Sequence, residues 1–119
     1  MVKRRHPEQA FQAQLVRALT SALTPKTYFF AVPNGGKRTP IEAAIFVGQG
    51  VKPGVPDLLF IHDGRAYGLE LKADKGRVTE IQRIVHDRLR SVGMRVGVAR
   101  TLDEAFAFLR DCGIPLRLA

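Results

Sequence analysis

The sequence predicts an α/β domain built around one mixed β-sheet of about four strands flanked by helices. Three observations support this: helix starts alternate with short apolar segments, those segments are rich in β-branched and aromatic residues, and one Asp-Gly pair separates two of them. The expected order is helix, strand, short helix, strand, strand, helix, strand, helix, which is typical of an α/β fold. A length of 119 residues fits one domain spanning residues 1–119.

The first helix is predicted over residues 7–23. Pro7 suits the first helical position, where its missing N–H is not needed. Apolar residues recur at the spacing of three and four that marks one buried face. They are Phe11, Leu15, Ala18, Leu19 and Ala22. Thr24-Pro25 ends this helix, and Thr27 to Val32 reads as a strand.

Three further helices begin with the same local pattern, a Thr three residues before Glu or Gln, which is the capping box. The three pairs are Thr39/Glu42, Thr79/Gln82 and Thr101/Glu104. The helices run to about Val47, Ser91 and Cys112. Gly48, Gly93 and Gly113 stand where C-terminal caps are expected. Between the last two helices, Met94 to Arg100 is predicted to be a strand.

A β-hairpin is predicted from Asp57 to His62 and from Arg65 to Ala73, joined by Asp63-Gly64. Asp-Gly favours a two-residue turn because both turn positions need positive φ. With residues 63 and 64 as the turn, counting back along both strands sets Asp57 opposite Glu70. Directly opposed residues share one sheet face, and Lys72 lies on that face as well.

The opposed carboxylates of Asp57 and Glu70 predict a metal site. They lie among apolar residues, where two negative charges repel each other and are costly to desolvate. A divalent cation would offset both the repulsion and the cost of desolvation. Hard ions such as Mg²⁺ or Mn²⁺ prefer carboxylate oxygens, waters and substrate phosphate as ligands. The alternative is a wet sheet edge at which Lys72 forms a simple salt bridge, and the spacing alone leaves it open.

Glu8 and Gln82 each have two explanations. Glu8 is favoured at a helix N-terminus by the helix dipole, but it also falls on the buried stripe and could reach a metal site. Gln82 is the expected capping partner of Thr79, yet its amide could also orient water or phosphate. His86 lies one turn beyond Gln82, and we expect it to be a surface or packing histidine.

The charge balance predicts a polyanionic partner. The net charge is +8, and nucleic acid is a better candidate than a membrane because no basic amphipathic helix stands out. Residues 33–38, Pro-Asn-Gly-Gly-Lys-Arg, place two glycines beside Lys37 and Arg38, so either a plain loop or a phosphate contact is expected there. The basic residues Lys75 and Arg77 follow the predicted hairpin.

The remaining composition excludes several other classes of protein. The single Cys112 cannot form an intramolecular disulfide or a zinc site by itself, and it fits a buried small hydrophobe. No apolar run approaches the roughly 18 residues of a membrane span, and no signal-peptide pattern opens the chain. We therefore expect a cytoplasmic protein.

Three segments together resemble a known family. They are residues 54–57 (Gly-Val-Pro-Asp), residues 69–72 (Leu-Glu-Leu-Lys) and residues 76–82 (Gly-Arg-Val-Thr-Glu-Ile-Gln). The combined pattern resembles the PD-(D/E)xK nuclease superfamily and, within it, the virus-type replication-repair nuclease (VRR-NUC) domain in its stand-alone phage and bacterial form. The nearest match to the family's Val-Arg-Arg signature is Val98-Ala99-Arg100. The resemblance covers nearly the whole chain and implies a restriction-endonuclease-like core.

The resemblance also implies a role for each site residue. Asp57, Glu70 and the main-chain carbonyl of Leu71 would bind Mg²⁺ or Mn²⁺, and Glu8 would support the metal directly or through water. Lys72 would orient or deprotonate the attacking water, and Gln82 would position water or phosphate. We expect DNA contacts from basic residues near this site, namely Lys37, Arg38, Lys75 and Arg77.

The activity that the resemblance implies is metal-dependent hydrolysis of DNA phosphodiester bonds. Single-domain relatives of this kind look like homodimers that cleave branched DNA, including four-way (Holliday) junctions. We therefore expect a structure-specific endonuclease that acts as a homodimer. Two alternatives remain open: a flap or nicking nuclease of the same fold, and a DNA-binding module without activity.

Overall fold

The computed structural model describes residues 7–33 and 38–117. The predicted order of elements is confirmed, with strand ends that are one or two residues shorter than expected. The helices are α1 (Pro7–Ala22), α2 (Pro40–Gly48), α3 (Glu80–Ser91) and α4 (Leu102–Asp111). The strands are β1 (Thr27–Ala31), β2 (Leu58–His62), β3 (Arg65–Leu71) and β4 (Arg95–Ala99).

The four strands form one mixed sheet in the order β1-β2-β3-β4. β2 is antiparallel to both of its neighbours, β1 and β3, whereas β4 pairs with β3 in parallel. The parallel pair requires a crossover, and α3 supplies it. The predicted mixed sheet flanked by helices is therefore confirmed.

The β2–β3 hairpin has the predicted turn and register. Asp63 and Gly64 have φ values of 52° and 76°, the left-handed conformation that the Asp-Gly signal requires. Leu58 pairs with Leu69 and His62 pairs with Arg65. Because this register continues to the preceding residue, Asp57 stands opposite Glu70, at the end of the hairpin far from the turn.

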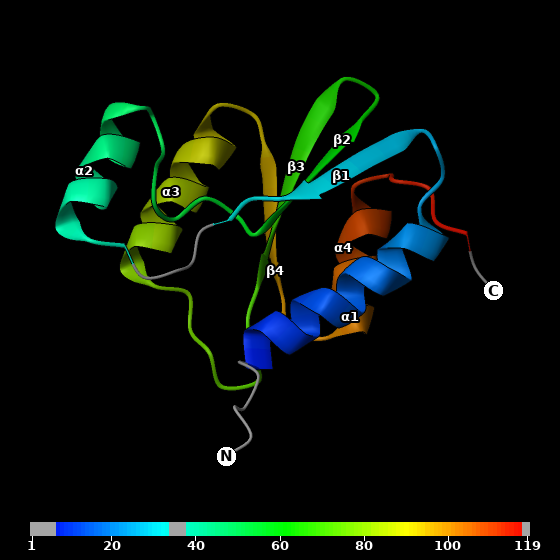
Figure 1. Cartoon of the computed structure of the whole chain (residues 1–119). Coiled ribbons are helices and arrows are strands. Elements are labelled where there is room, and N and C mark those ends of the chain that lie inside the picture. The colour runs from blue at the N-terminus through cyan, green and yellow to red at the C-terminus, as the bar shows by residue number, and fades with distance from the viewer. Residues whose placement is uncertain (1–6, 34–37, 118–119) are drawn as a thin grey trace, which may run out of the picture.

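The core lies between one face of the sheet and the helices α1 and α4, which lie together on that side (Figure 1). Leu15 and Leu19 of α1 are fully buried there, as the predicted apolar stripe requires. The sheet approaches α4 closely at Gly97, where a Cβ atom would lie 2.5 Å from the ring of Phe108. Glycine at this position therefore allows the helix and sheet to pack.

The opposite face of the sheet is only partly covered. α3 lies against its β3–β4 half, and the loop before β2 lies there too, since a Cβ atom at Gly68 would clash with Pro56 and Met94. α2 lies beyond α3, apart from the strands (Figure 1). It has no buried residue.

Two local predictions were wrong in detail. Thr101 accepts a bond from the Glu104 backbone N–H, but the Glu104 carboxylate accepts from Arg100 N, so only half of a capping box forms. Gly48 is the last residue of α2, and the left-handed position after that helix belongs to Gly50, with φ of 92°. The capping boxes of α2 and α3 are complete, as predicted.

No helix within residues 7–33 and 38–117 combines the length and the apolar character that a membrane span requires.

Candidate active site

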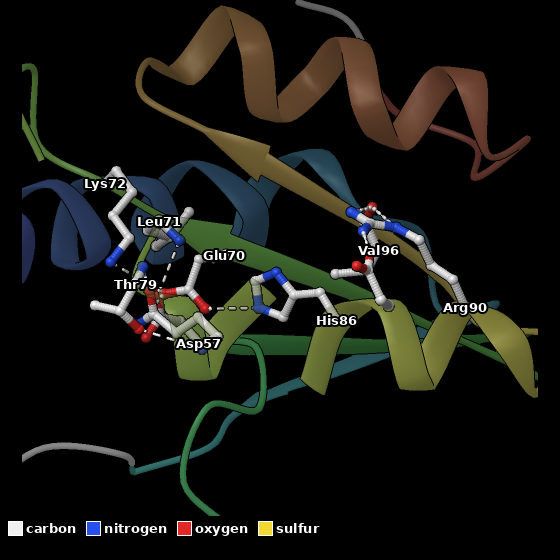
Figure 2. Close-up of polar contacts among 10 residues, drawn as sticks. Asp57, Glu70, Leu71, Lys72, Thr79, His86, Arg90 and Val96 are labelled. Atoms are coloured by element: carbon white, nitrogen blue, oxygen red, sulfur yellow. Dashed lines mark hydrogen bonds and ion pairs between the residues drawn. The ribbon is translucent and has the colours of Figure 1, made fainter. Parts of the chain in front are cut away.

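The candidate site lies where the start of β2, the end of β3 and the first turns of α3 meet (Figure 2). The hairpin register places Asp57 beside Glu70, and residue alternation along β3 places Lys72 on the same face. The capping box at Thr79 fixes where α3 begins, and the helix then carries Gln82 past the strands. Local turn and cap signals thus position the predicted residues.

Asp57 is half-buried and held by the backbone on both sides. Its carbonyl accepts a bond from Val32 N at 2.8 Å, which links it to the strand segment after β1. Its carboxylate oxygen Oδ2 accepts a bond from Leu71 N at 2.7 Å. The carboxylate is therefore oriented toward the end of β3 before any ligand binds.

Glu70 is a buried carboxylate, with 2% of its surface exposed. Its Oε1 is hydrogen-bonded to His86 Nε2 at 3.2 Å, and its Oε2 accepts a bond from Gln82 Nε2 at 3.4 Å. Burial raises the pKa of Glu70 to about 9, and the neighbouring Asp57 carboxylate acts in the same direction. Ionising both carboxylates at once is therefore unfavourable in the chain by itself.

Lys72 is buried as well, and its Nζ lies 4.0 Å from Glu70 Oε2. Its backbone N–H donates to Ala99 O at 3.1 Å, which continues the parallel pairing of β3 and β4 and fixes the residue's position. Lys72 lowers the pKa of Glu70, but burial and Asp57 outweigh it. The chain's own cation thus leaves this carboxylate pair incompletely compensated.

Gln82 fills the capping role predicted from the sequence, and its amide also contacts Glu70, while a role in orienting water or phosphate stays a prediction. Its Oε1 accepts a bond from Thr79 N at 2.9 Å, which completes the capping box. Its Nε2 is thereby turned toward Glu70, to which it donates. The cap orients the amide so that its donor group faces the site.

Glu8 lies in the first turn of α1 and is half-buried. Its carboxylate is directed to the loop after β3, where a Cβ atom at Gly76 would lie 2.9 Å from Glu8 Oε1. Glu8 also contributes to the raised pKa of Glu70, after burial and Asp57. The Glu8 carboxylate is therefore close enough to the site to affect the pKa of Glu70. Its support of a metal ion stays a prediction.

His86 is the site residue that sequence reasoning missed. Only 1% of its surface is exposed, and it contacts Glu70 from the opposite side to Lys72 (Figure 2). Burial lowers the pKa of His86, and the nearby Arg90 adds to the effect, so the ring is neutral near pH 7. Its separation of four residues from Gln82, which sets both on one face of α3, was the available signal.

The donor set fits a hard divalent cation. Within residues 7–33 and 38–117, no three His, Cys, Asp or Glu side chains are grouped closely enough to hold a metal ion by themselves, so Glu8 does not join Asp57 and Glu70 in one cluster. Mg²⁺ commonly binds through one or two carboxylates and keeps waters and phosphate as its other ligands. Asp57, Glu70 and the Leu71 carbonyl match that requirement, and a cation there would offset the excess negative charge.

A basic loop borders the site between β3 and α3. Lys75 and Arg77 are exposed on it. Arg100 ties the loop to β4, since its Nη1 donates to the carbonyls of Ala73, at 3.2 Å, and of Gly76. The sequence analysis did not assign this role to Arg100. The two exposed cations are thus held beside Lys72 by a specific contact.

Arg38, another predicted DNA-contact residue, lies just before α2. The guanidinium of Arg38 is exposed and lies over the ring of Phe46, with Cζ 4.2 Å from the ring centroid. Lys37 and the glycines before it lie outside the described residues, so their predicted phosphate contact stays a prediction.

Comparisons with known proteins bear on the fold. Searches against models of protein families and against curated proteins gave no match. Among solved structures, the chain is similar to a "VRR_NUC domain protein", with a TM-score of 0.69 and 22% sequence identity. The match covers 90% of this chain and 88% of that one. The chain therefore has the fold of a VRR-NUC domain protein, as its sequence motifs predicted.

Proposed function

We propose that this protein is a metal-dependent DNA endonuclease that hydrolyses phosphodiester bonds. The observation that carries the proposal is the buried Glu70, which stands opposite Asp57 and is surrounded by Lys72, Gln82 and His86. Simple binding of phosphate does not need two apposed carboxylates, because they would repel it. The similarity in fold to a VRR-NUC domain protein supports the same conclusion.

Asp57, Glu70 and the main-chain carbonyl of Leu71 are the proposed ligands of Mg²⁺ or Mn²⁺. Glu8 would support the metal through water, because among the described residues it does not join the two carboxylates in one cluster. When bound, such an ion lowers the pKa of a water molecule and stabilises charge on a phosphate oxygen. The orientation of Asp57 by Leu71 N, and of Glu70 by His86 and Gln82, prepares the carboxylates for this role.

Lys72 and Gln82 are the proposed groups that act on the attacking water and the phosphate. The Lys72 ammonium, held 4.0 Å from Glu70, would orient the water, favour loss of its proton through its positive charge and offset negative charge that develops in the transition state. Gln82 presents its amide N–H₂ to water or phosphate, since its oxygen is engaged in the helix cap. Both side chains are positioned by secondary structure, which limits their reorganisation during the reaction.

DNA is the proposed substrate. The net charge of +8 attracts a polyanion, and the exposed Lys75 and Arg77 border the site. Arg38 and Lys37 would extend the contact along the phosphate backbone. The expected product is a nicked DNA strand. The protein would contact the DNA mainly through its phosphates.

A homodimer acting on branched DNA is the proposed form. One small domain offers a limited DNA-binding face, whereas a two-fold pair can address two symmetry-related strands. A four-way junction presents such strands. We therefore propose that the protein resolves four-way junctions, and the expected partners are DNA and a second copy of the chain.

The test is cleavage of a labelled four-way junction, a linear duplex and a flap in Mg²⁺ or Mn²⁺. The wild type is expected to cut the junction best, and Asp57→Ala is expected to bind the junction without cutting it. Asp103→Ala is the matched control, since it removes an exposed acid from the first turn of α4 and should cut normally.

Each alternative has its own outcome in this assay. Cleavage of the flap alone would identify a flap nuclease of the same fold, and equal cleavage of all three would exclude junction specificity. Binding without cleavage by the wild type in either metal would identify a DNA-binding module. Normal cleavage by Asp57→Ala would refute the site itself.

A further inference from the structure

The sheet face that carries the candidate site continues into an exposed apolar surface on β1 and β2. Tyr28 is 72% exposed, Phe30 40% and Ile61 38%. Tyr28 pairs with Ile61 and Phe30 pairs with Leu59, so these four residues point to one side; we call them the apolar sheet surface. The rings of Tyr28 and Phe30 lie 6.2 Å apart.

This surface lies on the side away from the core. The intervening residue Phe29 stacks on Phe60 with ring centroids 5.8 Å apart, inside the cluster covered by α1 and α4. Asp57 precedes Leu59 by two residues, so the apolar sheet surface shares its face with the candidate site. Within the described part of the chain, α3 covers only the β3–β4 half of that face.

α2 is an apolar helix that buries none of its residues. Its nine residues, PIEAAIFVG, include only one charged side chain, Glu42. Ile41 is 74% exposed and Ile45 is 54% exposed. Together with Ala44 and Gly48 they form one helical face, which we call the α2 stripe. Small residues in this stripe allow close approach by a partner.

Among residues 7–33 and 38–117, α2 thus covers no sheet, and the apolar sheet surface has no covering helix. In an α/β domain each apolar sheet face is normally buried by helices, and contiguous exposed apolar patches mark interaction sites. We propose that two copies of the chain exchange these surfaces, so that the α2 stripe of each copy packs on the apolar sheet surface of the other. The inference rests on the proposed homodimer and assigns its interface.

Charge favours a second copy as the occupant. The chain carries a net charge of +8, so two copies repel each other over most orientations. Neither the apolar sheet surface nor the α2 stripe contains a Lys or Arg side chain. These are therefore places at which two such chains can meet without burying like charges.

Symmetry favours the same arrangement. A two-fold axis makes the helix-to-sheet contact twice, which helps a small domain reach the roughly 800 Å² per partner of a stable interface. Tyr28 supplies the kind of large aromatic side chain that acts as an anchor in interfaces. Because the apolar sheet surface shares its face with Asp57, each copy's α2 would lie near the site of its partner.

The test measures association in buffer without DNA or metal, so that it does not depend on nuclease activity. Sedimentation equilibrium should give the wild type twice the 13.2 kDa mass of the chain. Ile45→Glu in the α2 stripe and Tyr28→Lys in the apolar sheet surface should each raise the dissociation constant at least about 30-fold. Val92→Glu is the matched control, since Val92 is an equally exposed apolar residue outside both surfaces.

Mixing the two variants tests the reciprocal exchange. In a mixed dimer, the intact α2 of the Tyr28→Lys copy meets the intact sheet surface of the Ile45→Glu copy, and the two new charges are opposite. The mixture should therefore associate more tightly than either variant alone. Both substitutions lie at exposed positions, and far-UV circular dichroism checks that the fold is kept.

Four results would overturn the inference: a monomeric wild type, dissociation equal to that of the Val92→Glu control, a loss confined to Ile45→Glu, or no recovery on mixing. A monomer whose affinity for single-stranded DNA falls in Tyr28→Lys would instead assign the aromatic residues to base stacking. A dimer that does not cleave DNA would refute the proposed nuclease activity but not the proposed interface. A monomer that cleaves DNA would refute the interface but not the nuclease activity.

Discussion

The two halves of one sheet face reverse the usual relation between polarity and burial. On the β3 half, Lys72 and His86 both contact Glu70, and all three residues are almost completely buried. On the β1–β2 half, Tyr28 and Phe30 are exposed. Buried charges and exposed aromatic residues each cost free energy in an isolated chain.

In the proposals above, each half of this face binds a different partner. In the charged half, Lys72 compensates the two carboxylates only in part, and the proposed divalent cation would add the remaining positive charge. The apolar half lacks a cover, which a second copy of the chain would supply. The two proposed partners would thus bind different halves of one surface, and substitutions in each half should have different effects.

The largest effect is expected for Glu70→Gln, which removes the buried charge and keeps the size of the side chain. Cleavage should fall at least about 10³-fold, since several kcal/mol of metal-assisted stabilisation are lost. The melting temperature of the wild type should rise with Mn²⁺, and this rise should disappear in the variant. Glu80→Gln, at an exposed position of α3, is the control. A variant that is still stabilised by Mn²⁺ would exclude Glu70 as a ligand.

Lys72→Met removes the other buried charge in this half while keeping the apolar part of the side chain. Single-turnover cleavage with saturating DNA should fall about 10²- to 10³-fold, because the charge acts on the transition state. DNA affinity should change little. Lys75→Met is the control, because it removes a cation of the same loop region that is exposed. A wild-type cleavage rate in Lys72→Met would mean that this lysine serves only as the ion-pair partner of Glu70.

His86→Phe tests whether the buried histidine positions Glu70. The Mn²⁺ concentration that gives half-maximal cleavage should rise about 10- to 100-fold, the usual effect of removing a group that orients a ligand. The rate at saturating Mn²⁺ should largely recover, and His86→Gln should restore part of the affinity. His62→Phe changes a histidine at the other end of the hairpin, bonded to Thr27, and should leave the Mn²⁺ dependence unchanged.

Lys75→Gln and Arg77→Gln probe the exposed cations beside the charged half. Each should weaken binding similarly for all DNA sequences and lower the salt slope of log affinity by about one unit per lost phosphate contact. Arg110→Gln, in the last turn of α4, should leave the slope as it is. An unchanged slope in the loop variants would remove Lys75 and Arg77 from the DNA contact.

The smallest effect is expected for Tyr28→Thr in the apolar half. In protein dilute enough to be monomeric, the free energy of unfolding should change by less than about 0.5 kcal/mol, because an exposed side chain contributes little. Leu69→Ala, on the buried face of the same sheet, should cost about 2–5 kcal/mol. Chemical denaturation measures both. A large loss in Tyr28→Thr would mean that the aromatic side chain packs within its own chain.

The charged half could be predicted from sequence to the extent that local signals place it. The Asp-Gly turn determines the hairpin register, and the register places Asp57 opposite Glu70. The Thr79 cap determines where Gln82 lies. These contacts depend on residues close in the chain, so sequence patterns can predict them.

Contacts between elements could not be predicted in the same way. His86 reaches Glu70 only because α3 packs across β3, and Arg100 reaches the loop after β3 only because β4 pairs with β3 in parallel. Neither contact has a turn or cap signal of its own. The helical separation of Gln82 and His86 was the one sign that both face the same strand.

The sequence by itself determined the α/β class, the order of elements, the hairpin register and the pairing of two carboxylates with a lysine, because each follows from turn, cap and alternation rules over short stretches of chain. Only the tertiary structure decided how deeply Glu70 is buried, that His86 contacts it, and that no helix of the described segments covers the other half of the same sheet face. Burial is the result of packing between distant segments, so it appears only once all of them are in place.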